Sequence, residues 1–441
     1  MKIIDKIFSI KSSGSNMRRE ITGGITTFMT MSYIIFVQPA VMAACGMNKD
    51  AVITATCISA AVATLLMAFL ANYPIALAPA MGHNFYFAYV VCLGMGINWE
   101  VALGANFISG VIFIILAFVG LREKLINSVP SSIKNAIAVG IGLLIALIGM
   151  EWSGIIVKAP GTLIGLGNLK NPFVLLSLFG IITTSIFLSL RIKGAILLGI
   201  IINAVAALFL GIIKFNGFVG KPPSISETFL KLNILKVLNI NMLGVIFTLF
   251  FLDLFDTVGT LIGISEEAGF MRNGKLPRAR RALLSDAIGT VTGTCLGTST
   301  VTSYIESSTG VTDGARTGFA NIITALLFIL ALFLYPVIKM VSSGITVGKT
   351  TFYPIISPAL IIVGILMMAN VKKIDWSDYT EAIPSFLTIV IMSFSFSITE
   401  GIAFGFITYT ILKFVTRRFR EVSPLIYIFS CLFILRYIFL K

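Results

Sequence analysis

The sequence predicts an all-α protein that crosses a membrane many times, and three observations lead to this fold class. Composition is the first: 57% of the 441 residues are hydrophobic and 12% are charged, whereas soluble domains carry about 25% charged residues. The second is a series of apolar stretches long enough to span a bilayer. The third is a pair of such stretches whose helical pattern is interrupted. A chain of this kind has lipid, in place of water, around most of its surface.

About fourteen apolar stretches approach the roughly 20 residues that a helix needs to cross a bilayer. Those of the first half lie at roughly 19–46, 50–72, 75–96, 98–120, 131–151, 172–190 and 194–213. Those of the second half lie at roughly 240–266, 279–297, 299–315, 317–342, 351–369, 379–398 and 400–416. Each half therefore holds about seven spans. Because seven is odd, a second copy of one unit would lie upside down in the membrane, and such a 7+7 inverted repeat is a common plan of transporters.

The two ends of the chain differ from the spans in composition. Residues 1–18 form an amphipathic, basic segment without the apolar run and cleavage site of a signal peptide. If this segment is cytoplasmic, most of the 33 Lys and Arg residues also fall on cytoplasmic loops, among them Arg272, Lys275, Arg278, Arg280 and Arg281. The net charge of +14 thus reflects topology, and we expect no nucleic-acid partner. Residues 417–441 form a basic and apolar tail, and whether its apolar part enters the membrane is left open.

Metal, redox and hydrolytic chemistry are not expected. The five cysteines have no paired spacing, and the single histidine, His83, cannot build a histidine-rich metal site. No nucleophile motif such as Gly-x-Ser-x-Gly accompanies His83. We therefore expect no metal, no cofactor and no enzymatic activity.

Two apolar stretches, the third and the tenth, are interrupted at corresponding places in the two halves. In Tyr73–Gly96, two prolines and Gly82 break the helical pattern before an apolar run resumes. In Gly293–Gly310, the residues from Thr298 to Ile305 are mostly hydroxylated or β-branched and favour an extended backbone. Extended backbone at membrane depth is tolerated only where protein or a water-filled cavity satisfies its amides. Both segments are therefore expected to line an internal site.

Carboxylates inside spans cost at least roughly 2.5–3.5 kcal/mol and are functional candidates by default. The chain has four: Asp253, Asp256, Asp286 and Glu306. Asp253 and Asp256 lie three residues apart, near one helix face, and such a pair can keep a proton near neutral pH, which suits proton coupling. Alternatively, Asp253 only accepts a hydrogen bond from a neighbouring hydroxyl or amide. Asp286, close to the basic cluster, is more simply interpreted as structural.

The other site candidates lie where the interrupted segments change from extended to helical backbone. Glu306 is expected to project into the same cavity as the positive end of a half-helix. There its carboxylate could accept the N–H donors along one edge of a purine, or it could merely cap the helix. Asn84, at the equivalent junction of the third span, could cap the helix, bind solute, or both. One of the three aromatic residues Phe85, Tyr86 and Phe87 could stack on a base.

At these residues the sequence resembles the nucleobase/ascorbate transporter superfamily, specifically its AzgA-like guanine/hypoxanthine/adenine permease branch. The resemblance is most specific in ALAPAMGHNFYFAY (Ala76–Tyr89), DLFDTVGTLIG (Asp253–Gly263), GKLPRARRALLSDAIGT (Gly274–Thr290) and GTSTVTSYIESSTGV (Gly297–Val311). It implies a fourteen-span inverted repeat with a core domain at 19–120 and 240–342 and a gate domain at 131–213 and 351–416. It also implies a homodimer formed through the gate.

The resemblance implies substrate contacts from Asp256, Glu306, Asn84, Gly82, Phe85 and Ile305. His83 and Phe85 depart from the residues usual in this branch. The aromatic residue at position 85 resembles the third-span phenylalanine of the uracil and xanthine branches. Thr260 stands where those branches have a histidine or an acid. A coupling proton would therefore be taken up by Asp253, Asp256 or Glu306.

Together these observations predict a secondary active transporter in the inner membrane, with a cytoplasmic N-terminus. It is expected to import hypoxanthine, guanine or adenine by proton symport, with alternating access. One alternative is the same fold carrying uracil, xanthine or another small solute. A channel or a membrane-embedded enzyme is a more remote alternative, since a conducting pore needs polar residues along its length.

Overall fold

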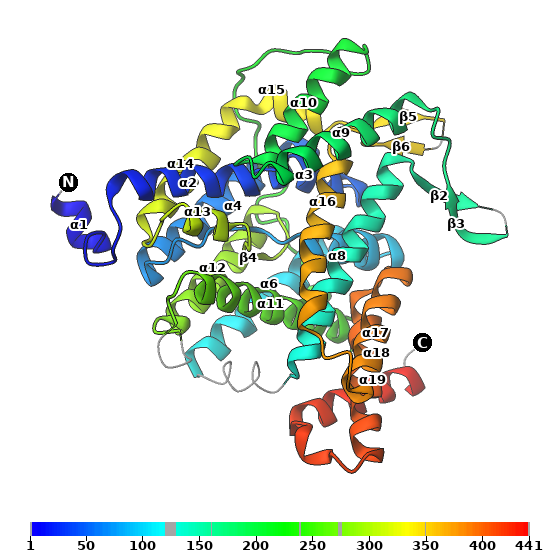
Figure 1. Ribbon diagram of the computed structural model, residues 1–441. Coiled ribbons are helices and arrows are strands. Elements are labelled where there is room, and N and C mark those ends of the chain that lie inside the picture. Colours follow the sequence, from blue (N-terminus) through cyan, green and yellow to red (C-terminus); the bar gives the residue numbers. More distant parts are fainter. Residues whose placement is uncertain are drawn as a thin grey trace. The chain divides into compact units, whose positions relative to one another are not determined.

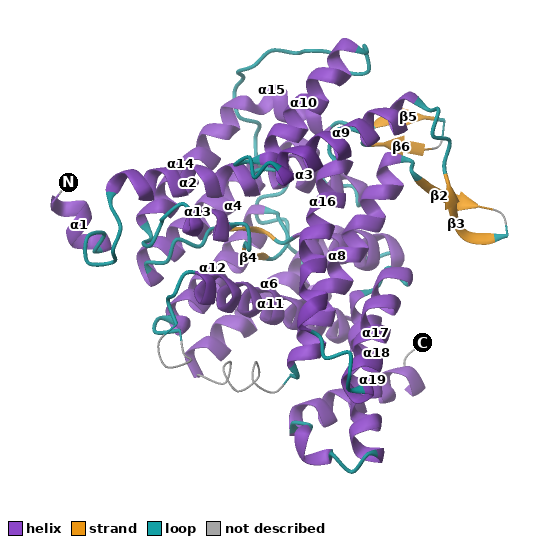
Figure 2. Cartoon of the chain, in the orientation of Figure 1, coloured by secondary structure: helices purple, strands orange, loops and turns teal. Residues whose placement is uncertain are grey.

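The computed structural model describes residues 2–119, 129–159, 161–237, 240–271, 276–348 and 350–439 (Figure 1). Helices account for most of this part of the chain, and its strands are short (Figure 2). Two members of the predicted basic cluster, Arg272 and Lys275, lie outside the described residues.

The helices of the first half are α1 (Lys2–Phe8), α2 (Met17–Met31), α3 (Ile34–Ala44), α4 (Lys49–Leu66), α5 (Met81–Phe85), α6 (Trp99–Val119), α8 (Ser131–Ser153), α9 (Pro172–Ser189) and α10 (Ala195–Phe209). Those of the second half are α11 (Ile240–Glu267), α12 (Ala279–Leu296), α13 (Ser307–Thr312), α14 (Phe319–Ala331), α15 (Tyr335–Ser342), α16 (Ser357–Met368), α17 (Tyr379–Phe394), α18 (Ile398–Val415) and α19 (Pro424–Phe439). Two π-helical segments, Met67–Ala71 and Tyr86–Gly94, continue α4 and α5.

The prediction of a helical, many-span membrane protein is confirmed. Eight helical stretches in the described chain are long and apolar enough to cross a bilayer: Met17–Ala44, Lys49–Ala71, Trp99–Ala117, Ser131–Ser153, Pro172–Ser189, Met242–Glu267, Phe319–Ser342 and Ile398–Val415. Shorter apolar helices follow at Ala195–Phe209, Tyr379–Phe394 and Pro424–Ile438. The remaining predicted spans are interrupted, short or more polar, which is why length and hydropathy do not identify them as single helices.

Extended segments occur in the third and tenth spans, as predicted. They are β1 (Leu77–Pro79) and β4 (Val301–Ser303), which pair antiparallel with Ala78 opposite Thr302. The backbone groups next to the strands bond across the same pair, since the amide of Ala80 donates to the carbonyl of Thr300 (2.9 Å). Both strands are fully buried. Each broken span thus satisfies the backbone of the other, which extended chain at membrane depth requires.

Two helices hold the strand pair from its flanks. Thr64 of α4 bonds to both the amide and the carbonyl of Leu77, each at 3.0 Å. Thr290 of α12 donates from its hydroxyl to the carbonyl of Val301 (2.9 Å). β4 accordingly lies beside α4 and α12 (Figure 1). Threonine hydroxyls therefore complete the hydrogen bonding that a two-stranded ribbon leaves open on its outer edges.

Two further hairpins pair locally. In one, β2 (Ile156–Ala159) pairs with β3 (Thr162–Leu166), and in the other β5 (Ile345–Val347) pairs with β6 (Thr350–Phe352). Their strands are partly or fully exposed. These hairpins are surface connections, unlike the buried β1–β4 pair.

The chain divides into two compact units. The first comprises residues 1–118 and 151–359, and the second comprises residues 119–150 and 360–441. The first unit contains both broken spans and every residue that the sequence proposes for substrate binding. The boundaries of the core and gate domains stay a prediction.

Candidate functional site

Asp256 lies against the strand that interrupts the tenth span. It belongs to α11, and its Oδ2 accepts a hydrogen bond from the Thr302 hydroxyl of β4 (3.2 Å). The side chain is partly exposed although its neighbours in α11 are almost all buried. A carboxylate placed in this way keeps acceptor capacity for a ligand, because a single hydroxyl occupies only one of its lone-pair sites.

Glu306 lies three residues after the end of the same strand and directly precedes the short helix α13. Its carboxylate does not cap α13. Instead, its Oε1 accepts a hydrogen bond from the phenol of Tyr33 (2.7 Å), and the residue is partly exposed. The geometry therefore does not support the alternative in which the Glu306 side chain only caps the helix. Ile305, directly before Glu306, is 45% exposed.

Asn84 connects the two broken spans. It lies in α5, directly after β1, and its Oδ1 accepts a hydrogen bond from the hydroxyl of Ser299, which precedes β4. It does not cap α5, whose N-cap residue is Ala80. Gly82 is buried in the same short helix. The structure thus brings Asn84 and Gly82 to one end of the β1–β4 pair. The amide oxygen of Asn84 is already bonded to the other broken span, through Ser299.

Phe85 belongs to an aromatic cluster that was not predicted from the sequence. Its ring lies 5.8 Å from that of Tyr89 and 6.2 Å from that of Trp152. Trp152 in turn packs on Tyr353, with ring centroids 4.4 Å apart, and donates from Nε1 to the Tyr89 hydroxyl (3.1 Å). Trp152 and Tyr353 are remote from Phe85 in sequence, and no local pattern marks them. An aromatic surface of this kind can accept a planar ring by stacking.

Asp253 and Asp256 have different partners. The hydroxyl of Thr257 lies 3.3 Å from Oδ1 of Asp253 and 2.8 Å from Oδ2 of Asp286. Asp286 also accepts from the backbone amide of Ser303 in β4 (3.0 Å). Asp253 and Asp286 are fully buried, whereas Asp256 is partly exposed. These hydrogen bonds agree with the alternative in which Asp253 bonds to a neighbouring hydroxyl. They also agree with a structural role for Asp286.

His83 lies between Gly82 and Asn84 and is 2% exposed. Neither ring nitrogen has a hydrogen-bond partner among the described residues. Within the same part of the chain, no group of three or more His, Cys, Asp or Glu side chains could hold a metal ion.

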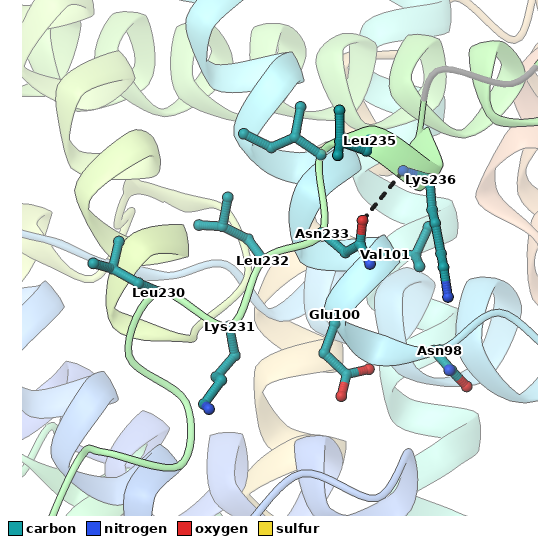
Figure 3. Close-up of a pocket in the computed structure, with 10 residues that line it drawn as sticks. Asn98, Glu100, Val101, Leu230, Lys231, Leu232, Asn233, Leu235 and Lys236 are labelled. Atoms are coloured by element: carbon teal, nitrogen blue, oxygen red, sulfur yellow. Dashed lines mark hydrogen bonds between the residues drawn. The ribbon is translucent and has the colours of Figure 1, made fainter.

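A surface pocket lies elsewhere in the first unit, between the start of α6 and the loop 230–236 (Figure 3). The loop is held there because the amide of Asn233 donates to the carbonyl of Glu100 (2.8 Å) and the side chain of Asn233 accepts from the amide of Lys236 (3.2 Å). None of the residues proposed for substrate binding lines this pocket. It is therefore a feature of loop packing, separate from the candidate site.

Comparison with known proteins identifies related sequences over the whole chain. The Permease family matches residues 18–404. The guanine/hypoxanthine permease PbuG of Bacillus subtilis is 44% identical, with 98% of this chain and 99% of that protein covered. The adenine permease AdeP of Escherichia coli is 41% identical, with 99% and 96% covered. A protein of Methanocaldococcus jannaschii, described only as a candidate permease, is 51% identical, with 100% and 99% covered.

Solved structures share the fold at low sequence identity. The transmembrane domain of the cyanobacterial bicarbonate transporter BicA has a TM-score of 0.60 at 15% identity, with 88% of this chain and 97% of that chain covered. Murine Slc26a9, an anion transporter in the inward-facing state, has a TM-score of 0.65 at 10% identity, with 91% and 69% covered. These transporter membrane domains have the core-and-gate fold class expected from the sequence. The chain therefore belongs to the Permease family, within the nucleobase/ascorbate transporters, and is a membrane transporter, not an enzyme.

Proposed function

We propose that the protein imports purine nucleobases, namely hypoxanthine, guanine or adenine. The observation that carries the proposal is the placement of two partly exposed carboxylates: Asp256 lies beside β4, and Glu306 lies three residues after its end. Relatives that are 41% and 44% identical over nearly their whole length carry the names adenine permease and guanine/hypoxanthine permease. Two acidic acceptors suit a neutral base that presents N–H donors, and they suit an anion poorly.

In this proposal the base lies beside the β1–β4 pair, where Asp256 bonds to Thr302. Glu306 and Asp256 accept its N–H groups, and the backbone at Ile305 offers further hydrogen bonds. Asn84 contributes its amide, while Gly82 adds no side chain that would fill the space. Phe85 supplies an aromatic face for the ring, for which stacking is worth roughly 1–3 kcal/mol per base.

The proposal includes symport with a proton and alternating access. Asp253, Asp256 and Glu306 are the candidates to carry the proton, because each carboxylate lies inside or beside a broken span, where a charge is costly. Asp256 and Glu306 are the better placed of the three, since both are partly exposed and Asp253 is fully buried. Movement of the core against the gate would then expose the site to each side of the membrane in turn.

Location and assembly complete the proposal. The protein is placed in the cytoplasmic (inner) membrane with residues 1–18 in the cytoplasm, supported by the distribution of Lys and Arg among the loops. A homodimer formed through the gate is supported by the family resemblance alone.

Uptake of radiolabelled hypoxanthine into vesicles that contain the purified protein tests the proposal. We expect uphill uptake with an inward proton gradient, and competition by unlabelled guanine and adenine but not by uracil or xanthine. Glu306→Gln should abolish most of this uptake. Glu100→Gln, the same change in the surface pocket away from the site, is the matched control and should leave uptake intact. Competition by uracil or xanthine alone would overturn the substrate, and uptake insensitive to the proton gradient would overturn symport.

A further inference from the structure

The first span, which the sequence shows as one apolar stretch, is broken at a residue that contacts the candidate site. Helix α2 ends at Met31 and α3 begins at Ile34, with Ser32 and Tyr33 between them. The side chain of Tyr33 is 1% exposed, and its hydroxyl donates to Oε1 of Glu306 (2.7 Å). A fourth span therefore reaches the site, in addition to α11, which carries Asp256, and to the two spans that carry the paired strands.

Several contacts fix Tyr33 in this position. Its ring lies 6.4 Å from that of Tyr304, whose own hydroxyl donates to the carbonyl of Pro79 (2.5 Å). One turn before Tyr33, the hydroxyls of Thr30 and Thr309 lie 3.1 Å apart, which ties α2 to α13. The phenol is thus held by Tyr304 and Glu306, which follow β4, and by the contact of α2 with α13. It cannot follow Glu306 if the carboxylate rotates, so the hydrogen bond selects one orientation of that carboxylate.

We propose that Tyr33 is a positioning residue that orients the carboxylate of Glu306 for the transported base. The inference deepens the proposed function and rests on it. With Oε1 bonded to the phenol, Oε2 is the oxygen left to accept an N–H group of the base.

Tyr33→Phe removes the hydroxyl and keeps the ring, so it tests the hydrogen bond without opening a cavity. We expect binding of hypoxanthine to the purified protein to weaken about tenfold, which corresponds to the loss of one hydrogen bond to a charged group. Tyr73→Phe, which removes a hydroxyl that accepts from the amide of Arg278, is the control and should leave binding unchanged.

A double-mutant cycle separates a positioning role from a structural one. If Tyr33 acts through Glu306, Tyr33→Phe adds little further loss of binding in the Glu306→Gln background. Full, independent losses in the two variants would overturn the inference, as would unchanged binding in Tyr33→Phe. Unchanged binding in Glu306→Gln itself would instead remove Glu306 from the site and overturn the proposed function.

Discussion

At the scale of single residues, one intramembrane acid holds the backbone of the broken span. Asp286 accepts from both the amide and the hydroxyl of Ser303, at 3.0 and 3.3 Å, and from the hydroxyl of Thr257. A charged group at this depth is costly unless it is fully bonded. Three donors provide that bonding here, and in return they fix β4 next to the proposed binding residues.

Asp286→Ala should therefore destabilise the protein. The amide of Ser303 would lose its partner in a buried setting, at a cost of about 1–3 kcal/mol. Thermal unfolding in detergent measures the loss, together with hypoxanthine uptake. Asp286→Asn keeps one acceptor oxygen for Ser303 and should be milder in both respects. An Ala variant with wild-type melting temperature and uptake would show that Asp286 does not hold β4.

At the scale of elements, helix α2 approaches α13 and α14 through glycines. A Cβ atom on Gly23 would lie 2.7 Å from the carbonyl oxygen of Gly310, and one on Gly24 would lie 2.4 Å from that of Ala320. Small residues allow such approaches between membrane helices, where van der Waals packing and hydrogen bonds drive association. The approach also positions the end of α2, and with it Tyr33.

Gly24→Ala should cost about 1–3 kcal/mol of stability, because the backbone oxygen of Ala320 cannot move aside. Gly244→Ala is the matched control: a Cβ there meets no atom within 4 Å, and alanine is favoured over glycine in a helix by up to about 1 kcal/mol. Melting temperatures of the two variants in one detergent give the comparison. Equal behaviour of both would contradict the tight packing of α2.

A second element-scale feature is the ion cluster where α17 and α18 approach the tail. Lys413 is completely buried and lies 2.9 Å from Glu381 and 2.8 Å from Glu421. Arg418 lies 2.5 Å from Asp378 and 2.8 Å from Glu421. Hydrogen bonds from Arg418 and Lys413 lower the pKa of Glu421 to about 2. The Thr380 hydroxyl and Arg418 lower the pKa of Asp378 to about 2.

A lowered folded-state pKa means that the contribution of Glu421 to stability is present above its unfolded pKa and is lost as the pH falls toward 2. The difference in melting temperature between the wild type and Glu421→Gln should thus be constant above about pH 5 and shrink toward about pH 3. Glu421 is 45% exposed, so the difference should be small. Glu266→Gln, at an exposed acid of α11, is the control. A difference that grows on acidification would contradict the ion cluster.

At the scale of the whole molecule, the last helix runs back along α18. The hydroxyl of Ser430 bonds to the carbonyl of Phe406 (3.0 Å), and Arg436 pairs with Glu400 (2.9 Å). Later residues of α19 therefore meet earlier residues of α18, which makes the two helices antiparallel. The exposed side chains of α19 are mostly apolar, including Ile428, Leu432, Leu435 and Ile438. With this packing and an apolar exposed face, α19 is expected to cross the membrane beside α18, although it is shorter than the eight candidate spans.

The C-terminus should accordingly lie on the membrane face opposite to residues 417–421. In a variant without native cysteines, a cysteine at Arg420 and one added after Lys441 should react with an impermeant reagent from opposite sides of oriented vesicles. Modification of both from the same side would show that α19 lies on the surface.

The sequence identified the membrane class, the two broken spans and the residues at their junctions, because composition and backbone preference act locally. Pro79 and the hydroxylated run before Glu306 disfavour a helical backbone locally, whereas Gly82 lies inside the short helix α5. Asp256 and Glu306 stand out for a similar reason, since any carboxylate within an apolar stretch is conspicuous. The hydroxyl partner of Asp253 could also be anticipated, because Thr257 lies one helical turn away.

Only the tertiary structure decided what these residues meet. The pairing of β1 with β4 joins segments separated by more than half of the chain, and Tyr33, Trp152 and Tyr353 come to the site or to Phe85 from other spans. Hydropathy places each of these residues in a span and says nothing of which face of which neighbour it contacts. Long-range hydrogen bonds and ring contacts select one packing among many with the same local pattern, so the orientation of Glu306 by Tyr33 follows from the fold and not from the sequence alone.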